Sequence, residues 1–227
     1  MTAERVRATN AAAAPLRPVK LGPADALLER KSDGTIYIRS PHPLGAYPDK
    51  ITERLEHWAR IAPDRDFLAQ RAAGGAWRRL SYSQVLAQVR SIAQALLQRG
   101  LSTDRPVVIL SGNDIEHALL GLAAMMAGIP YAPISVPYSL MSSDFGKLKS
   151  IIQTLTPGVV FASDGKVFGR AIEAAVPRDV EIVVAANPPE GRPATLFAEL
   201  LAITATAAVD AAHAKVGPDT IAKFLFT

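Results

Sequence analysis

The spacing of hydrophobic positions changes along this chain, and each spacing predicts a different element. In "DKITERLEHWARIA", from residue 49, apolar side chains recur at Ile51, Leu55, Trp58 and Ala62, a helical interval that predicts one buried stripe. The pattern then changes, because "DFLAQR" and "WRRL" flank the turn sequence "AAGGA" and predict a β-hairpin. A helix followed by a hairpin is therefore expected between residues 49 and 80.

A longer helix is predicted in "LSYSQVLAQVRSIAQALLQRG", which begins at residue 80. Ser81 and Gln84 have the spacing of a capping box, and Gly100 is expected to end the helix. The side chains expected on its buried stripe are aliphatic: Val85, Val89, Ile92 and Leu96.

After residue 105, short apolar runs alternate with helical patterns. The expected strands are "PVVIL", "IPYAPI", "GVVFAS", "VEIVVAA" and, last, "IAKFLFT" (221–227). The helices expected between them are "DIEHALLGLAAMMAG", apolar over a wide arc, "SSDFGKLKSIIQTLT", with Ser142, Ser143 or Asp144 as its cap, "KVFGRAIEAAV" and "TLFAELLAI". Because such alternation is typical of βαβ units, the predicted fold class is α/β, with a mostly parallel sheet flanked by helices on both faces.

The first 45 residues differ from the rest in being rich in proline and alanine. The proline density argues against a long helix there. We expect a largely irregular N-terminal extension over residues 1–45, with "TIYIRS" (35–40) as one edge strand, and a single α/β domain over residues 46–227.

Composition excludes several classes of protein. Hydrophobic residues make up 49% of the chain and charged residues 20%, which is typical of a globular protein. Cysteine is absent, so disulfides, a cysteine nucleophile and thiolate metal sites are excluded, in keeping with a cytoplasmic location. The net charge of +4 is diffuse, and no basic run interleaved with aromatic residues predicts nucleic-acid binding. No stretch approaches the roughly 20 apolar residues of a membrane span.

The most site-like feature is "LSGND" (110–114), where a predicted strand ends and a helix begins. Open α/β sheets bind ligands at such places, but an ordinary tight turn capped by Asn113 or Asp114 explains the pattern as well and is favoured. We expect no metal site at Asp114, Glu116 and His117, because adjacent Glu and His side chains point in different directions. The role of "YAPISVPYS" (131–139), as a cleft wall or a stiff loop, stays open.

Several segments, in order, resemble the adenylate-forming (AMP-binding) superfamily of acyl- and aryl-CoA synthetases, peptide-synthetase adenylation domains and luciferases. They are "LSYSQVLAQVRSIAQALLQRGL" (80–101), "RPVVILSGNDIEHALLGLAAMMAGIPYAPIS" (105–135) and "KFLFT" (223–227). The segments "YPDKITERLEHWARIAPDRDFLAQR", "YSLMSSDFGKLKSIIQTLTPGVVFASDG" and "GPDTIAKFLFT" resemble, in particular, the bacterial feruloyl-CoA synthetase group.

This resemblance implies the N-terminal part of an adenylate-forming enzyme fold and an ATP-dependent acid-CoA ligase acting on ferulate or a related hydroxycinnamate. In that reaction the carboxylate attacks the α-phosphate of ATP, and the thiol of coenzyme A then displaces AMP. The implied cofactors are ATP, Mg²⁺ and coenzyme A. Thr227 alone matches a binding motif, as the first residue of the ATP loop.

In family members the rest of that loop, the Mg²⁺-binding acid and a C-terminal lysine follow later. The chain is therefore expected to be truncated at the ATP loop and inactive alone, with no catalytic residue of its own. Two other readings stay open. A non-catalytic module would bind a partner, or self-associate through an unfinished sheet edge. A Rossmann-like nucleotide binder would use "SGND" at the switch point of the sheet.

Overall fold

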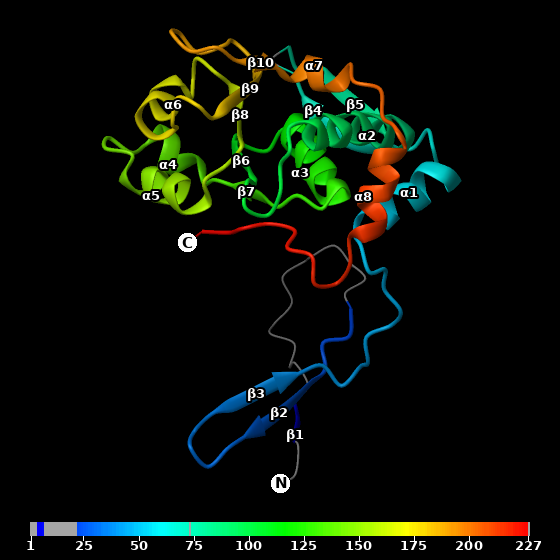
Figure 1. Ribbon diagram of the computed structural model, residues 1–227. Coiled ribbons are helices and arrows are strands. Elements are labelled where there is room, and N and C mark those ends of the chain that lie inside the picture. Colours follow the sequence, from blue (N-terminus) through cyan, green and yellow to red (C-terminus); the bar gives the residue numbers. More distant parts are fainter. Residues whose placement is uncertain (1–3, 7–21, 73, 227) are drawn as a thin grey trace. The chain divides into compact units, whose positions relative to one another are not determined.

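The computed structural model describes residues 4–6, 22–72 and 74–226 (Figure 1). The chain divides into two compact units, residues 1–47 and 48–227. In the first unit, β1 (Glu4–Val6), β2 (Ala26–Arg30) and β3 (Ile36–Arg39) form an antiparallel sheet in that order. The hydrophobic pattern predicts only the strand at 35–40 in this region. The structure has it as the edge strand β3 and adds β1 and β2.

The second unit is built on a five-stranded sheet in which every pairing is parallel, in the order β10-β9-β8-β6-β7. Its strands are β6 (Val107–Leu110), β7 (Tyr131–Pro133), β8 (Val159–Asp164), β9 (Glu181–Ala186) and β10 (Thr195–Leu196). A separate antiparallel hairpin consists of β4 (Asp66–Arg71) and β5 (Trp77–Ser81). The parallel sheet confirms the predicted fold class, and β6, β7, β8, β9 and the hairpin confirm their predicted strands. The short strand β10 instead occupies the first two residues of a predicted helix, "TLFAELLAI".

Helices cover both faces of the parallel sheet (Figure 1). Side chains of α1 (Thr52–Ile61), α2 (Tyr82–Gln98), α3 (Ile115–Ala127), α7 (Phe197–Leu201) and α8 (Ala207–Lys215) pack on one face. Those of α5 (Gly146–Leu155) and α6 (Gly169–Ala175) pack on the other, where α4 (Val136–Leu140) contributes Tyr138 at the margin. Successive residues of β6 alternate between the two clusters and are all buried, which explains its unbroken apolar sequence.

The helix α2 confirms its predicted cap and stripe. The Ser81 hydroxyl accepts a hydrogen bond from the Gln84 amide, and the Gln84 side chain accepts one from the Ser81 amide. Its predicted stripe is fully buried: Val85, Val89, Ile92 and Leu96. The helix α3 carries buried residues over several of its faces, as its wide apolar arc predicts.

Three further expectations need correction. Ile51 precedes α1 and is 64% exposed, because Thr52 is buried in its place with its hydroxyl 2.8 Å from His213 Nε2. Helix α5 has Phe145 at its cap position, with a left-handed φ of 55°, and not one of the three expected residues. The Ser142 hydroxyl accepts a hydrogen bond from the Phe145 amide, and the Asp144 carboxylate accepts one from the Gly146 amide. Residues 221–226 do not form a strand, since only one parallel bridge, between Tyr131 and Lys223, pairs them with the sheet.

Candidate functional site

The turn that follows β6 is fixed by its own side chains. Asp114 is the N-cap of α3, and its carboxylate accepts a hydrogen bond of 2.7 Å from the His117 amide. Burial raises the pKa of Asp114 above its ordinary value, and the bond from His117 offsets part of that shift. Of the two caps expected from the sequence, the structure therefore selects Asp114.

The His117 imidazole is used within the same turn. Its Nδ1 lies 2.9 Å from the Ser111 hydroxyl and 3.1 Å from the Gly112 carbonyl oxygen. Because a carbonyl oxygen only accepts, and the Ser111 hydroxyl itself donates to Gly112, Nδ1 carries the proton and donates. Among residues 4–6, 22–72 and 74–226, no three His, Asp or Glu side chains lie close enough together to hold a metal ion.

The hairpin reaches across to the first turn of α3. The Gln70 side-chain oxygen accepts a hydrogen bond of 3.1 Å from the Ile115 amide, and Arg78 pairs with Glu116 at 2.5 Å. The amides of Ile115 and His117 are therefore both already donated to protein oxygens. A phosphate at this helix N-terminus would have to displace them and would also meet the Asp114 carboxylate. The geometry thus favours the ordinary turn over a Rossmann-like phosphate site.

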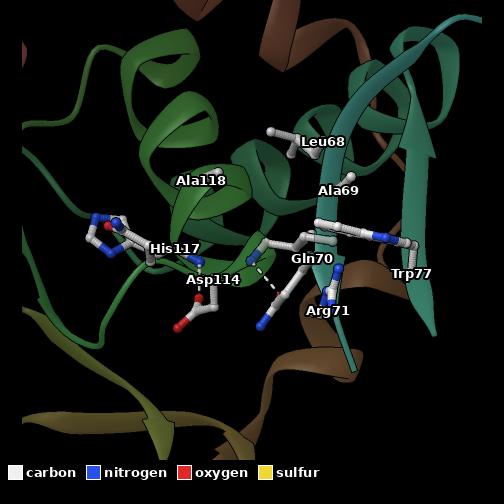
Figure 2. A pocket seen from close by; sticks show the side chains of 10 residues that line it. Leu68, Ala69, Gln70, Arg71, Trp77, Asp114, His117 and Ala118 are labelled. Carbon is white, nitrogen blue, oxygen red and sulfur yellow. Dashed lines mark hydrogen bonds between the residues drawn. The ribbon is translucent and has the colours of Figure 1, made fainter. Parts of the chain in front are cut away.

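A pocket of about 480 Å³ lies between the hairpin and the first turn of α3; we call it the hairpin pocket. Its walls are residues 68–71 of β4, Trp77 of β5 and side chains from 113–118. Figure 2 shows Gln70 between Asp114 on one side and Arg71 with Trp77 on the other. The Arg71 guanidinium carbon lies 5.0 Å from the centroid of the Trp77 ring.

Of the hairpin-pocket residues, sequence reasoning selected Asn113, Asp114 and His117 but missed Gln70, Arg71 and Trp77. The available signal was the hairpin itself. Trp77 stands at the start of a short strand with arginines at 71 and 79, and alternation places those three side chains on one face.

The last described residues run beside β7. The Tyr131 amide donates to the Ala222 carbonyl at 3.3 Å, and the Phe224 amide donates to the Tyr131 carbonyl at 3.0 Å. Phe224 and Phe226 pack against the buried cluster on the face of α5 and α6. Because the bridge is parallel, residues 224–226 run toward the carboxyl edge of the sheet. Thr227, the residue matched to the ATP loop, lies outside the described residues.

Comparison with known protein families identifies the family to which this chain belongs. A family model described as "AMP-binding enzyme" matches residues 55–227, which is most of the chain. The fold and this match define an adenylate-forming enzyme domain. The chain belongs to the AMP-binding enzyme family.

Individual relatives agree with that family. Over 88 residues the chain is 38% identical to tyrocidine synthase 1 of Brevibacillus parabrevis, a match that covers 39% of this chain and 8% of that protein. The structure of a fatty acyl-adenylate ligase from L. pneumophila, in complex with acyl adenylate and pyrophosphate, matches 78% of this chain and 27% of its own at 16% identity and a TM-score of 0.53. ATP-bound MatB from Rhodopseudomonas palustris matches 76% of this chain and 32% of its own at 24% identity and a TM-score of 0.52.

The two structures establish the likeness of fold. The chain spans less than a third of each of these three relatives. Within the described residues, no helix has the length and apolar character needed to cross a membrane.

Proposed function

We propose that this chain is the N-terminal part of an ATP-dependent acid-CoA ligase of the cytoplasm, with ferulate or a related hydroxycinnamate as its acid. Family membership supports the adenylate-forming chemistry, and the ordered likeness of residues 40–227 to the feruloyl-CoA synthetase group supports the acid. One structural observation carries the proposal. The segment 222–226 is held parallel to β7 and runs toward the carboxyl edge of the sheet, where α/β proteins bind ligands.

The segment 222–226 would lead into the ATP-binding loop in the proposed reaction. In the proposed reaction, the acid carboxylate displaces pyrophosphate from ATP, and the coenzyme A thiol then displaces AMP to give a thioester. Thr227 would contribute the first hydroxyl and amide of the loop that surrounds the triphosphate with Mg²⁺. The rest of that loop motif does not occur in the 227 residues, so we propose that they are inactive by themselves.

The identity of the acid substrate is tested by measuring ATP–pyrophosphate exchange on the longest protein that contains these 227 residues. The panel holds ferulate, 4-hydroxycinnamate, benzoate, malonate, palmitate and phenylalanine. We expect exchange above background with the two hydroxycinnamates and weaker exchange with the others. Faster exchange with palmitate, malonate or phenylalanine would replace the hydroxycinnamate proposal and leave the ligase proposal in place.

A partner-binding role has one observation in its favour. Ile221 is 46% exposed and Leu225 is 66% exposed, in a segment joined to the sheet by a single bridge. Exposed apolar side chains beside a poorly paired edge favour association with another copy. We therefore also propose that the 227-residue chain self-associates. Light scattering over a range of concentrations tests this, and a monomer at every concentration would contradict it.

A further inference from the structure

The hairpin pocket holds a cation, an aromatic ring and a carboxylate, and the proposed ligase chemistry uses none of them. Figure 2 shows the cation and the ring at one end and the carboxylate at the other, with Gln70 between them. Its volume of about 480 Å³ lies within the roughly 300–1,000 Å³ that is typical of small-molecule sites.

Arg71 is the available cation of the hairpin. Its neighbours on β5 are paired, Arg78 with Glu116 and Arg79 with Asp66, each at 2.5 Å. Among the residues that the structure describes, no carboxylate pairs with Arg71, whose guanidinium instead lies over Trp77. An exposed guanidinium held in place by an aromatic ring is suited to binding a carboxylate with both of its N–H edges.

Trp77 supplies a flat apolar surface next to that cation. The residue is 50% exposed, so much of its indole remains open to a second planar group. Aromatic groups that pack on an indole gain both buried area and ring–ring attraction. The combination of Arg71 and Trp77 therefore suits a planar molecule with a single negative charge.

The far end of the pocket selects a different group. The Gln70 oxygen is used by the Ile115 amide, which turns the Gln70 nitrogen outward as a donor. Asp114 uses one carboxylate oxygen for the His117 amide, and a carboxylate has further lone pairs to offer. This end accepts a hydroxyl or N–H group and repels a second anionic group. Polyphosphates are therefore disfavoured.

We propose that the hairpin pocket is a second binding site, for a planar aromatic carboxylate that carries a hydrogen-bond donor at its opposite end. The carboxylate meets Arg71, the ring lies against Trp77, and the distal donor bonds the Asp114 carboxylate. This site consists of residues of the hairpin, of the turn before α3 and of the first turn of α3. It does not depend on the proposed ligase activity, and its ligand remains chemically unchanged.

The test is a titration of the 227-residue chain with 4-hydroxycinnamate, followed by calorimetry and by the indole N–H signals of Trp77 and Trp58 in NMR spectra. Cinnamate, which lacks the hydroxyl group, is the matched ligand, and AMP is the nucleotide control. We expect saturable binding of 4-hydroxycinnamate with a shift of the Trp77 signal. Cinnamate should bind more weakly, and AMP should leave Trp77 unchanged.

Three variants locate the ligand. Arg71→Gln should weaken binding of 4-hydroxycinnamate by about tenfold or more, since a hydrogen bond to a charged group contributes about 1.5–3 kcal/mol. Arg79→Gln removes a neighbouring arginine that also faces Trp77 but is paired with Asp66, and it should leave the affinity unchanged. Asp114→Asn retains a residue that caps helices well, and it should abolish the preference for 4-hydroxycinnamate over cinnamate.

The proposal is overturned if no binding is detected, if the Trp77 signal does not move, or if Arg71→Gln binds as tightly as the parent chain. Binding with no preference for the hydroxylated ligand would overturn the role of Asp114. Because this test measures binding and not turnover, a failure to bind 4-hydroxycinnamate at the hairpin pocket does not contradict the proposed ligase activity. The absence of ATP–pyrophosphate exchange likewise does not contradict the proposed binding site in the hairpin pocket.

Discussion

At the carboxyl ends of β8 and β9, single side chains determine the shape of the turns. Asp164 accepts hydrogen bonds from the amides of Lys166 and Val167, and its other oxygen accepts one of 2.7 Å from the Asn187 side chain. Burial alone would raise the pKa of Asp164, but these hydrogen bonds outweigh it and lower the pKa below its ordinary value. Gly165 lies at the centre of this arrangement, where a Cβ atom would come within 2.6 Å of the Asn187 carbonyl oxygen.

A first prediction concerns that contact. Gly165→Ala should lower the free energy of unfolding by about 1–3 kcal/mol, because the new methyl group meets backbone that cannot move cheaply. Urea denaturation followed by tryptophan fluorescence measures this, since Trp58 and Trp77 both belong to the unit 48–227. Gly169→Ala is the matched control, because its Cβ meets nothing within 4 Å, and it should change stability by no more than about 1 kcal/mol. Equal stability of the two variants would contradict the contact.

At the scale of elements, α8 is joined to α1 and α2 by polar contacts. Asp210 forms two hydrogen bonds with Arg90 of α2, at 2.6 and 2.9 Å. The His213 ring bonds Thr52 at 2.8 Å and lies 3.5 Å from Glu56, while Lys50 donates to the His213 carbonyl. Burial lowers the pKa of His213 below its ordinary value of 6.5, and Glu56 offsets only part of the shift. Folding therefore disfavours the protonated form of this imidazole.

That shift predicts how stability depends on pH. A histidine whose pKa is lowered by folding binds its proton more readily in the unfolded chain, so protonation favours unfolding. The contribution of His213 is fully present above about pH 6.5 and is lost as the pH falls toward the lowered pKa of the folded state. Urea midpoints measured between pH 7.5 and 5 should fall, and His213→Gln should reduce the slope. His57→Gln is the control, and an equal reduction by both variants would contradict the assignment to His213.

The terminal segment is the second element whose attachment can be measured. Phe226 packs against the cluster beneath α5 and α6, whereas Leu225 is 66% exposed. Phe226→Ala should weaken docking by roughly 1–2 kcal/mol, so hydrogen exchange of the Phe224 amide should accelerate about five- to thirty-fold. Leu225→Ala should leave that exchange rate unchanged. Faster exchange in both variants, or in neither, would show that Phe226 does not hold the segment.

The sequence predicts those elements whose pattern is decided locally. The stripe of α2 and its cap at Ser81 follow from spacing and from one hydroxyl group, and both are confirmed. The end of the chain shows the limit, because "IAKFLFT" has the composition of a buried strand, yet among its described residues, 221–226, only Lys223 pairs with the sheet. Strand pairing requires free backbone N–H and C=O groups on the neighbouring strand, and β7 has only three residues. The hydrophobic pattern also does not predict α4 and α8, since α4 contains Pro137 and the sequence of α8, AAVDAAHAK, has no apolar stripe of large side chains.

The candidate site was predictable only where it lies within a few residues. The Asp114 cap follows from the residues next to it, whereas the assignment of Thr227 to the ATP loop stays a prediction from a motif. The hairpin pocket joins Gln70 and Trp77 to α3, more than 35 residues away along the chain, so spacing within one element gives no indication of it.

For the whole molecule, the family and the fold agree that the chain is one part of an adenylate-forming architecture. Its parallel sheet is covered on both faces by its own helices, so the unit 48–227 has a buried hydrophobic cluster on each face of the sheet. We propose Thr227 as the first residue of the ATP loop, and the remaining residues of that loop motif do not occur among the 227. We therefore propose that the 227 residues fold but do not catalyse the reaction by themselves, a separation of fold and catalysis.

The most direct measurement of that claim is hydroxycinnamate-dependent ATP–pyrophosphate exchange, made side by side on the 227-residue chain and on the longest protein that contains it. We expect no exchange above background for the 227 residues and clear exchange, dependent on added ferulate or 4-hydroxycinnamate, for the longer protein. Exchange by the 227 residues alone would contradict the separation of fold and catalysis. A longer protein that catalyses no exchange with any carboxylic acid would contradict the proposed ligase.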